Sequence, residues 1–192
     1  MQLGERIPDA LASCSVFGPD GGPIALSRFW SAGPALLVFL RHFGCIGCSE
    51  QVAGLAPRLP EMNALGIRTV FIGNGAPHFI ENFIERFALS ERKVEIVTDP
   101  ELAAYTAAGL RRSAWAAFGP VAMLDVLRAL GQGHINRLGE GDNLQQGGAV
   151  LVDTDGTVAW HQRSRSLGGH ARAVEVVDAA MHLIMKKLEP AT

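Results

Sequence analysis

The sequence predicts an α/β protein built around a partly parallel sheet, and three observations support this prediction. Short apolar runs of strand length, such as PALLVFL at residues 34–40, have the composition of strands buried on both faces. Segments with helical periodicity separate these runs, and this alternation is typical of parallel strands joined by helices. The chain then ends in two strand-like runs around a tight turn and one long helical segment.

The N-terminal part predicts a β-hairpin followed by the first central strand. Residues 11–17 and 24–26 flank GPDGG at 18–22, whose glycine, proline and aspartate residues favour a turn. Residues 26–30 have the length of one short helical turn. The apolar run at 34–40 follows, and we expect it to be a central strand of the sheet.

An interrupted helix is expected to begin at about Cys45. Its apolar residues at helical spacing are Val52, Leu55, Leu59, Met62 and Leu65. Gly54, Pro57 and Pro60 must kink or break this helix, since proline lacks the backbone N–H that a helix interior needs. Gly66 then ends it.

Two more strands and two more helices are expected before residue 111. Residues 67–74 are rich in β-branched residues and predict a strand. Residues 76–89 predict an amphipathic helix with Pro77 in its first turn. The apolar face of that helix consists of Phe79, Ile80, Phe83 and Phe87. A third short strand at 94–100 and a helix at 101–110 complete this part.

The rest of the chain predicts an insertion, a β-hairpin and a closing helix. For residues 111–146 we expect one or two helices plus a loop, because structureless loops of that length are uncommon. Residues 148–163 predict two strands around a tight turn, and a last helix covers about 170–188. The apolar stripe of that helix consists of Val174, Val177, Met181, Ile184 and Leu188. The order βαβαβα followed by ββα matches a thioredoxin-like core with N-terminal additions, so we expect a single domain over residues 1–192.

Composition excludes several classes of protein. The net charge is −2 with no long block of one sign, which argues against nucleic-acid binding and against a membrane-surface protein. Residues 1–8 lack the apolar core of a signal peptide, and no apolar run approaches the ~20 residues of a membrane helix. Three cysteines are too few for a disulfide-stapled secreted scaffold. We therefore expect a cytoplasmic protein in a reducing compartment.

Cys45 and Cys48 form a CxxC pair directly after the predicted strand at 34–40. If Cys45 opens the next helix, the unsatisfied N–H groups and the helix dipole there favour its thiolate. Cys48, one turn along, points to the same side and can attack a sulfur-bound intermediate on Cys45 to close a disulfide. Arg41 and His42 precede the pair and are candidates for adding positive charge, although a solvated strand end and a polar loop residue are ordinary roles for them.

A metal site and chance spacing are the alternatives to a redox pair. A structural zinc site needs four ligands, but the one further cysteine is Cys14 and no two histidines have a His-x₃₋₅-His spacing. Cys14 lies in the predicted N-terminal strand, where we expect a buried structural cysteine. Gly-x-Gly patterns at 131–133 and 139–141 do not join a strand to a helix, so a dinucleotide site is not expected either. We expect no metal ion and no cofactor.

Three stretches carry a family resemblance. LRHFGCIGC at 40–48, VTDPELAAYTAAGLRR at 97–112 and GDNLQQGG at 141–148 resemble the peroxiredoxin-like branch of the alkyl hydroperoxide reductase/thiol-specific antioxidant (AhpC/TSA) family. The resemblance implies a thioredoxin-like fold and an antioxidant thiol oxidoreductase that reduces a peroxide or similar oxidant. It also implies Cys45 as nucleophile, Cys48 as resolving partner, and an insertion near the active-site face.

The resemblance also bears on substrate and partners. Thioredoxin-like proteins carry a cis-proline before the strand that faces the CxxC, and Gly147 or Gly148 holds that place here. We expect these glycines in a substrate-facing loop with room beside the sulfurs. A thioredoxin- or glutathione-type reductant is implied, and the apolar segment 111–130 is a candidate surface for a partner or a homodimer. The alternatives are a protein-disulfide reductase and a redox-sensing or binding module without turnover.

Overall fold

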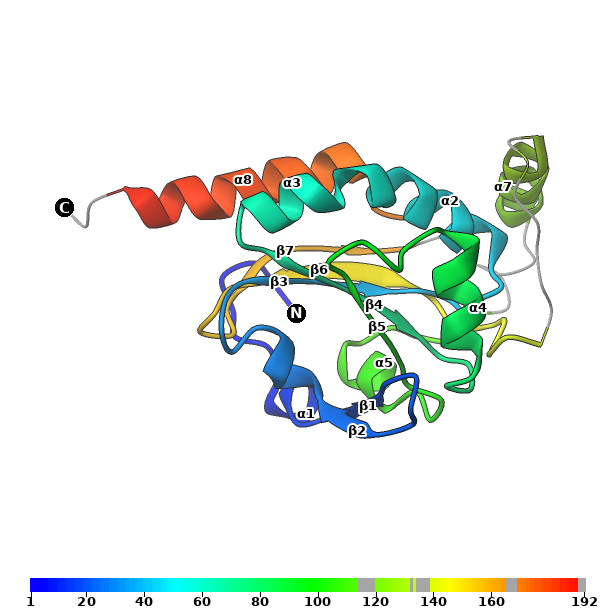
Figure 1. Cartoon of the computed structure of the whole chain (residues 1–192), viewed down its shortest axis with the longest axis horizontal. Helices are drawn as coiled ribbons and strands as arrows, with labels where there is room; N and C mark the ends of the chain where they lie inside the picture. The colour runs from blue at the N-terminus through cyan, green and yellow to red at the C-terminus, as the bar shows by residue number, and fades with distance from the viewer. Residues whose placement is uncertain (114–119, 132, 134–138, 165–168, 190–192) are drawn as a thin grey trace.

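The computed structural model describes residues 1–113, 120–131, 133, 139–164 and 169–189, and shows one mixed sheet of seven strands in these ranges (Figure 1). The strand order is β2-β1-β5-β4-β3-β6-β7. The strands are β1 (Ser15–Phe17), β2 (Pro23–Ala25), β3 (Ala35–Phe39), β4 (Arg68–Gly73), β5 (Glu95–Thr98), β6 (Gly148–Val152) and β7 (Val158–Arg163). Strands β3, β4 and β5 are parallel, and the other pairings are antiparallel. The predicted α/β class with a partly parallel sheet is confirmed.

Helices cover both faces of the sheet. Figure 1 shows α2, α3 and α8 over one face and α1 and α5 over the other, with α4 at the side and α7 beyond one end. The helices are α1 (Asp9–Ala12), η1 (Leu26–Phe29), α2 (Ile46–Leu55), η2 (Ala56–Arg58), α3 (Leu59–Ala64), α4 (Phe79–Arg86), α5 (Ala103–Ala107), α7 (Pro120–Gly131) and α8 (Ala173–Leu188). In the part of the chain that the structure describes, no helix is long and apolar enough to cross a membrane.

Strand β3 lies between β4 and β6 and supplies both hydrophobic cores. Its side chains alternate: Leu36 and Val38 pack with residues of α2 and α8, whereas Leu37 and Phe39 pack with residues of α1 and α5. All five residues of the strand are fully buried. The uninterrupted apolar run therefore predicted a strand buried on both faces correctly.

The N-terminal hairpin is shorter than predicted. Residues 15–17 and 23–25 do pair as strands, but residues 9–12 form the helix α1 rather than the start of the first strand. Asp9 in the first turn suits a helix N-terminus, and Leu11 on this helix is fully buried against the core. Cys14 follows α1, is half-buried, and its thiol donates a hydrogen bond to the Ala10 carbonyl (3.0 Å). The predictions of strand structure and full burial for Cys14 are wrong.

The break predicted at Pro57 is confirmed, but Gly54 lies inside α2 and Pro60 lies in the first turn of α3. Pro57 lies in the 3₁₀ turn η2 between α2 and α3, and Gly66, at φ +72°, ends α3. One detail of α4 is also wrong. Pro77 precedes α4 instead of lying in its first turn, because α4 begins at Phe79.

The apolar stripe predicted for the last helix is largely wrong. Of its members, Val174, Met181 and Leu188 are exposed. The side that packs on the core consists of Val176, Val177, Ala180 and Leu183. Small Ala180 on this side leaves space for α8 to approach α2, α3 and β7, the elements it contacts.

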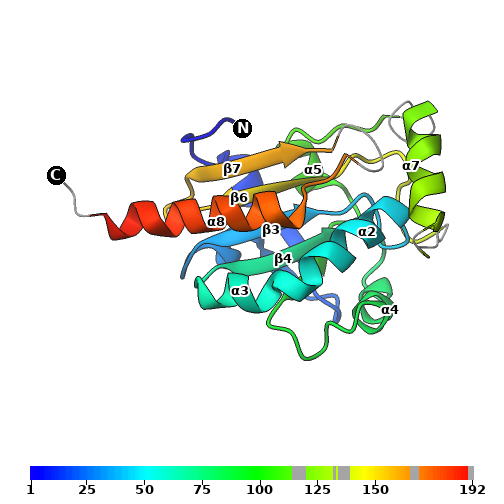
Figure 2. The same cartoon turned by 90° about the horizontal axis from the view of Figure 1, so that it is seen from above.

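The insertion contains the helix α7, which packs against α2. Figure 2 shows α7 beside the amino-terminal end of α2, so the expected place near the cysteines is confirmed for this helix. Residues 114–119 and 134–138 of the insertion lie outside the described residues. Its last part returns to the core through residues 139–146, where Gln145 forms a bridge with Arg112.

Candidate active site

Cys45 is the N-cap residue of α2. Strand β3 ends at Phe39, and Cys45 has the extended conformation (φ −67°, ψ 126°) typical of an N-cap before the helix begins at Ile46. Its carbonyl accepts hydrogen bonds from the backbone N–H (2.9 Å) and the hydroxyl (3.0 Å) of Ser49. The first N–H groups of α2 have no helical acceptor and surround the sulfur. The predicted position of Cys45 at the start of the helix is therefore confirmed.

The surroundings of Cys45 favour its thiolate at neutral pH. Its pKa is lowered to about 7, first by the hydrogen bond from the Cys48 thiol, then by the positive charge of Arg41 and the N–H groups of Cys48 and Gly47. Burial opposes these effects, because it disfavours the charged form. The thiolate of Cys45 is therefore favoured near neutral pH relative to that of an ordinary cysteine.

Cys48 has the opposite character. Burial raises the pKa of Cys48 well above its usual value, and the neighbouring Cys45 sulfur raises it further. The Cys48 sulfur accepts a hydrogen bond from the backbone N–H of Arg41 (3.1 Å). The pair is therefore asymmetric: Cys45 holds the negative charge, and Cys48 keeps its proton and donates it toward Cys45.

Arg41 and His42 differ in what they contribute. Arg41 is 3% exposed, and its Nη2 donates to the Asn143 carbonyl (2.9 Å), which holds its charge near the sulfurs. His42 is also buried, and burial, together with the charge of Arg41, lowers its pKa to about 4. The imidazole is therefore neutral near pH 7, so of the two candidates for positive charge Arg41 supplies it and His42 does not.

Gly147, just before β6, and Gly148, its first residue, are both buried. A Cβ on Gly147 would lie 2.6 Å from the Phe39 carbonyl oxygen, and one on Gly148 would lie 2.8 Å from that of Gln162. Glycine is thus needed for close packing of this turn on β3 and β7. Backbone oxygens of β3 and β7 therefore stand where a side chain at these two positions would begin, and the substrate-facing role of the glycines stays a prediction. None of the peptide bonds in the described ranges is cis.

Three polar residues that sequence reasoning missed join the loop of Cys45 to the insertion. We call Asn74, Arg86 and Glu140 the clamp. The Arg86 guanidinium donates to the carbonyl of Phe43 (2.9 Å) and to the carboxylate of Glu140 (3.0 Å). The side chain of Asn74 donates to the Arg41 carbonyl and accepts from the Asp142 backbone N–H. The clamp therefore fixes both residues that flank His42, on the loop that leads to Cys45.

Breaking the ion pair of the clamp is expected to destabilise the fold. Its side chains are 18% (Arg86) and 10% (Glu140) exposed, so Arg86→Met leaves a nearly buried carboxylate without its partner. We expect a loss of about 2 kcal/mol in the free energy of unfolding, measured in urea. The double variant Arg86→Met/Glu140→Gln should recover part of this loss, because it removes the unpaired charge. Equal stability of Arg86→Met and the unchanged protein would contradict a structural role for the pair.

The cysteines do not lie within a cluster of metal ligands. Among the residues that the structure describes, no three or more His, Cys, Asp or Glu side chains are placed to hold a metal ion. The arrangement of an acidic thiol beside a protonated one supplies what thiol redox chemistry needs: an attacking thiolate and a second thiol in contact with it.

Comparison with known proteins agrees with this geometry. A family model described as "AhpC/TSA antioxidant enzyme" matches residues 54–166, which is more than half of the chain. The chain belongs to the AhpC/TSA antioxidant enzyme family. The matched range begins after Cys48, so the family assignment does not depend on the CxxC pair.

Relatives of this AhpC/TSA family member carry thioredoxin-like and peroxiredoxin-like names. The chloroplastic thioredoxin-like protein AAED1 of Arabidopsis thaliana is 27% identical over 92% of this chain and 74% of its own length. Peroxiredoxin-like 2C of Homo sapiens is 26% identical over 87% of this chain and 77% of its own length. Prostamide/prostaglandin F synthase of Salmo salar is 31% identical over 71% of this chain and 68% of its own length. With one relative named chloroplastic, the cytoplasmic location stays a prediction.

The solved structures agree on the fold. Peroxidoxin BcpB from Mycobacterium tuberculosis superimposes with a TM-score of 0.66, 16% identity and 99% coverage of both chains. Reduced Prx3 from Vibrio vulnificus gives 0.65, with 12% identity and coverage of 94% of this chain and 99% of that one. The predicted thioredoxin-like fold is therefore confirmed.

In this AhpC/TSA family member the thiols are buried, and α7 of the insertion packs against the helix that they begin. Cys45 is only 1% exposed, and α7 lies against the helix that Cys45 opens (Figure 2). One ion pair joins the two helices: Arg128 on α7 contacts Glu50 on α2 at 2.9 Å. Because Cys45 is buried, we expect an oxidant to reach its sulfur only after neighbouring residues move.

Removing this ion pair is expected to make Cys45 more reactive. An exposed pair contributes up to about 1 kcal/mol, so Arg128→Ala should speed alkylation of Cys45 by iodoacetamide about two- to fivefold. The matched control is Arg58→Ala, which breaks the exposed Arg58–Glu61 pair (2.8 Å) between η2 and α3, a pair that does not involve α7. The same alkylation rate in all three proteins would show that the pair does not hold α7 in place.

Proposed function

We propose that the chain is a thiol oxidoreductase that reduces a peroxide, with Cys45 as the attacking thiolate and Cys48 as the resolving thiol. The observation that carries this proposal is the opposite shift of the two thiol pKa values, lowered for Cys45 and raised for Cys48. Membership of the AhpC/TSA family and the peroxiredoxin-like names of relatives support it.

The proposed reaction has three steps. The Cys45 thiolate attacks the terminal oxygen of a hydroperoxide; the O–O bond breaks, Cys45 becomes a sulfenic acid, and the alkoxide leaves and takes up a proton. The Cys48 thiol then attacks the Cys45 sulfur, forming a disulfide and releasing water. An external dithiol or thiol system of the thioredoxin or glutathione type returns two electrons and two protons.

Burial of Cys45 favours a small oxidant over a protein disulfide. A cysteine that is 1% exposed admits a small peroxide after a local movement, whereas a folded protein substrate needs a wide opening. For this reason the protein-disulfide reductase is the second proposal.

The redox-sensing alternative rests on the surface of α7. Met123, Leu124, Leu127 and Leu130 are exposed on this helix, as predicted for a partner or homodimer surface. Sustained peroxide turnover with a thioredoxin or glutathione system would count against a sensor. Oxidation of one equivalent without recycling would support it. The homodimer and the single domain over residues 1–192 stay predictions.

The disulfide itself tests the mechanism. After treatment of the reduced protein with one equivalent of hydrogen peroxide, we expect a loss of two mass units located by mass spectrometry in a peptide that contains both Cys45 and Cys48. Cys14, half-buried and outside the site, serves as the internal control and should stay reduced. A disulfide that involves Cys14, or no disulfide at all, would contradict the assignment of Cys48.

A further inference from the structure

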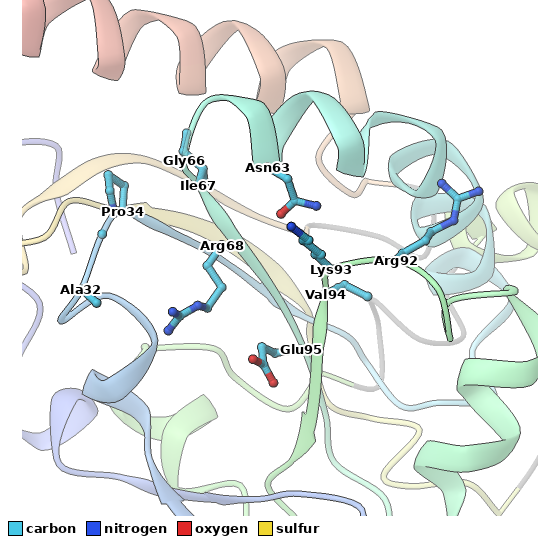
Figure 3. A pocket seen from close by; sticks show the side chains of 11 residues that line it. Ala32, Pro34, Asn63, Gly66, Ile67, Arg68, Arg92, Lys93, Val94 and Glu95 are labelled. Atoms are coloured by element: carbon cyan, nitrogen blue, oxygen red, sulfur yellow. The ribbon is translucent and has the colours of Figure 1, made fainter.

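A hollow lies at the opposite end of the sheet from the cysteines. It is bordered by the segments that lead into β3, β4 and β5, whereas Cys45 follows the far end of β3 (Figure 3). Its volume is about 480 Å³, within the range of small-molecule sites. A smaller hollow of about 310 Å³ adjoins it, and Arg68 and Glu95 border both.

The larger hollow carries an excess of positive side chains, although the chain as a whole is weakly anionic. Arg68, Arg92 and Lys93 line it, against one carboxylate, Glu95, whereas the whole chain has a net charge of −2. The adjoining hollow adds Arg28. Four cations from three chain segments therefore gather around one acid, and such a concentration of positive charge attracts anions.

Two of the guanidinium groups are held in place by backbone carbonyls. Nη1 of Arg68 donates to the carbonyls of Phe29 (3.2 Å) and Arg28 (3.3 Å), and Nη1 of Arg92 donates to that of Ala56. A guanidinium has five N–H donors, so these bonds orient each group and leave donors for a ligand. Figure 3 shows Arg92 extending toward one margin of the hollow, while Arg68 lies on the side of Ala32.

Unpaired donors complete the hollow. In Figure 3 the side chains of Lys93, in the segment just before β5, and Asn63, on α3, come close together. Neither has a hydrogen-bond or ion-pair partner among the residues that the structure describes, and neither does the carboxylate of Glu95. The hollow thus offers positive centres at Arg68 and Lys93 and one acceptor at Glu95.

We propose that this hollow binds a small hydrophilic molecule with two anionic groups, phosphate or carboxylate. Arg68 suits bidentate binding of one group and Lys93 binds the other as a point charge. Glu95 accepts a hydrogen bond from a hydroxyl or ammonium group of the same molecule. No aromatic side chain lines the hollow, so a nucleotide base has no surface to stack on.

Calorimetric titration with inorganic pyrophosphate at fixed ionic strength tests the proposal. We expect saturable 1:1 binding with a dissociation constant below about 1 mM, and Lys93→Gln should weaken it about tenfold. The matched control is Lys186→Gln, which removes the same charge from the exposed face of α8 and should leave binding unchanged. Binding should also be unchanged in Cys45→Ser, because the hollow is separate from the thiols.

Two further measurements identify the anionic group that binds and do not depend on the folding of variants. Citrate in place of pyrophosphate distinguishes carboxylate from phosphate, and binding of either supports the proposal. Amide chemical shifts of the unchanged protein should move at Arg68, Lys93 and Glu95 on titration. Three results would overturn the proposal. Neither probe binds saturably at concentrations 10-fold above the expected dissociation constant, or Lys186→Gln weakens binding as much as Lys93→Gln does. The third is that the amide chemical shifts change at lysines elsewhere in the chain.

Discussion

Replacing Cys45 with serine is expected to abolish hydroperoxide consumption by the protein. A serine hydroxyl is not ionised near neutral pH, whereas the thiolate of Cys45 is favoured there because its pKa is lowered to about 7. Without the attacking sulfur neither the sulfenic acid nor the disulfide forms. The measurement is the rate of hydroperoxide loss with the reduced protein in excess, so that no external reductant is needed.

Cys48→Ser and Cys14→Ser separate the roles of the three thiols. With Cys48→Ser we expect one oxidation per chain and a sulfenic acid on Cys45 that dimedone traps, since the resolving thiol is gone. Cys14→Ser should react like the unchanged protein, because Cys14 lies between α1 and β1, away from the site. If Cys45→Ser consumes hydroperoxide as fast as the unchanged protein, Cys45 is not the nucleophile.

The fold was predictable where one feature of the sequence has only one structural outcome. The apolar run of β3 fits only a strand buried on both faces, and Pro57 forces a break between α2 and α3. In α8 the sequence is ambiguous, because Val174, Met181 and Leu188 are spaced for a helix face just as Val177 and Ala180 are. Only packing against α2, α3 and β7 decides which side is buried.

The site was predictable only where it is local in the sequence. Cys45 and Cys48 lie within one turn of a helix that follows a strand, so their contact could be foreseen. Glu140 lies 54 residues from Arg86, and Asp142 lies 68 residues from Asn74, so no spacing in the chain indicated the clamp. A glycine-rich loop that carries acidic residues was the one available signal.

His42 and Gly147 show why burial must be known before chemistry is assigned. A histidine beside two thiols suggests a positive charge, but desolvation and the charge of Arg41 keep it neutral. A glycine in place of proline suggests space, but the backbone of β3 occupies that space. The roles of both residues depend on three-dimensional packing, which composition does not encode.

Replacing Arg41 with glutamine is expected to slow the reaction at neutral pH by raising the pKa of Cys45. The charge of Arg41 is one of the causes that lower this pKa, after the hydrogen bond from Cys48. A rise of one unit takes the thiolate from about one half to about one tenth at pH 7, a roughly fivefold loss of rate. The backbone N–H of residue 41 still donates to Cys48, so the pair keeps its geometry.

The pH dependence separates this electrostatic effect from damage to the fold. Only the thiolate reacts, so the alkylation rate of Cys45 rises with pH through its pKa, with a midpoint near 7 for the unchanged protein. Arg41→Gln should shift the midpoint upward and equal the unchanged protein at pH 9–10, where both are fully ionised. Arg41→Lys keeps the positive charge, so its midpoint should lie close to that of the unchanged protein. A rate that stays low at every pH would instead mean that Arg41 acts through its hydrogen bond to the Asn143 carbonyl, in the last part of the insertion.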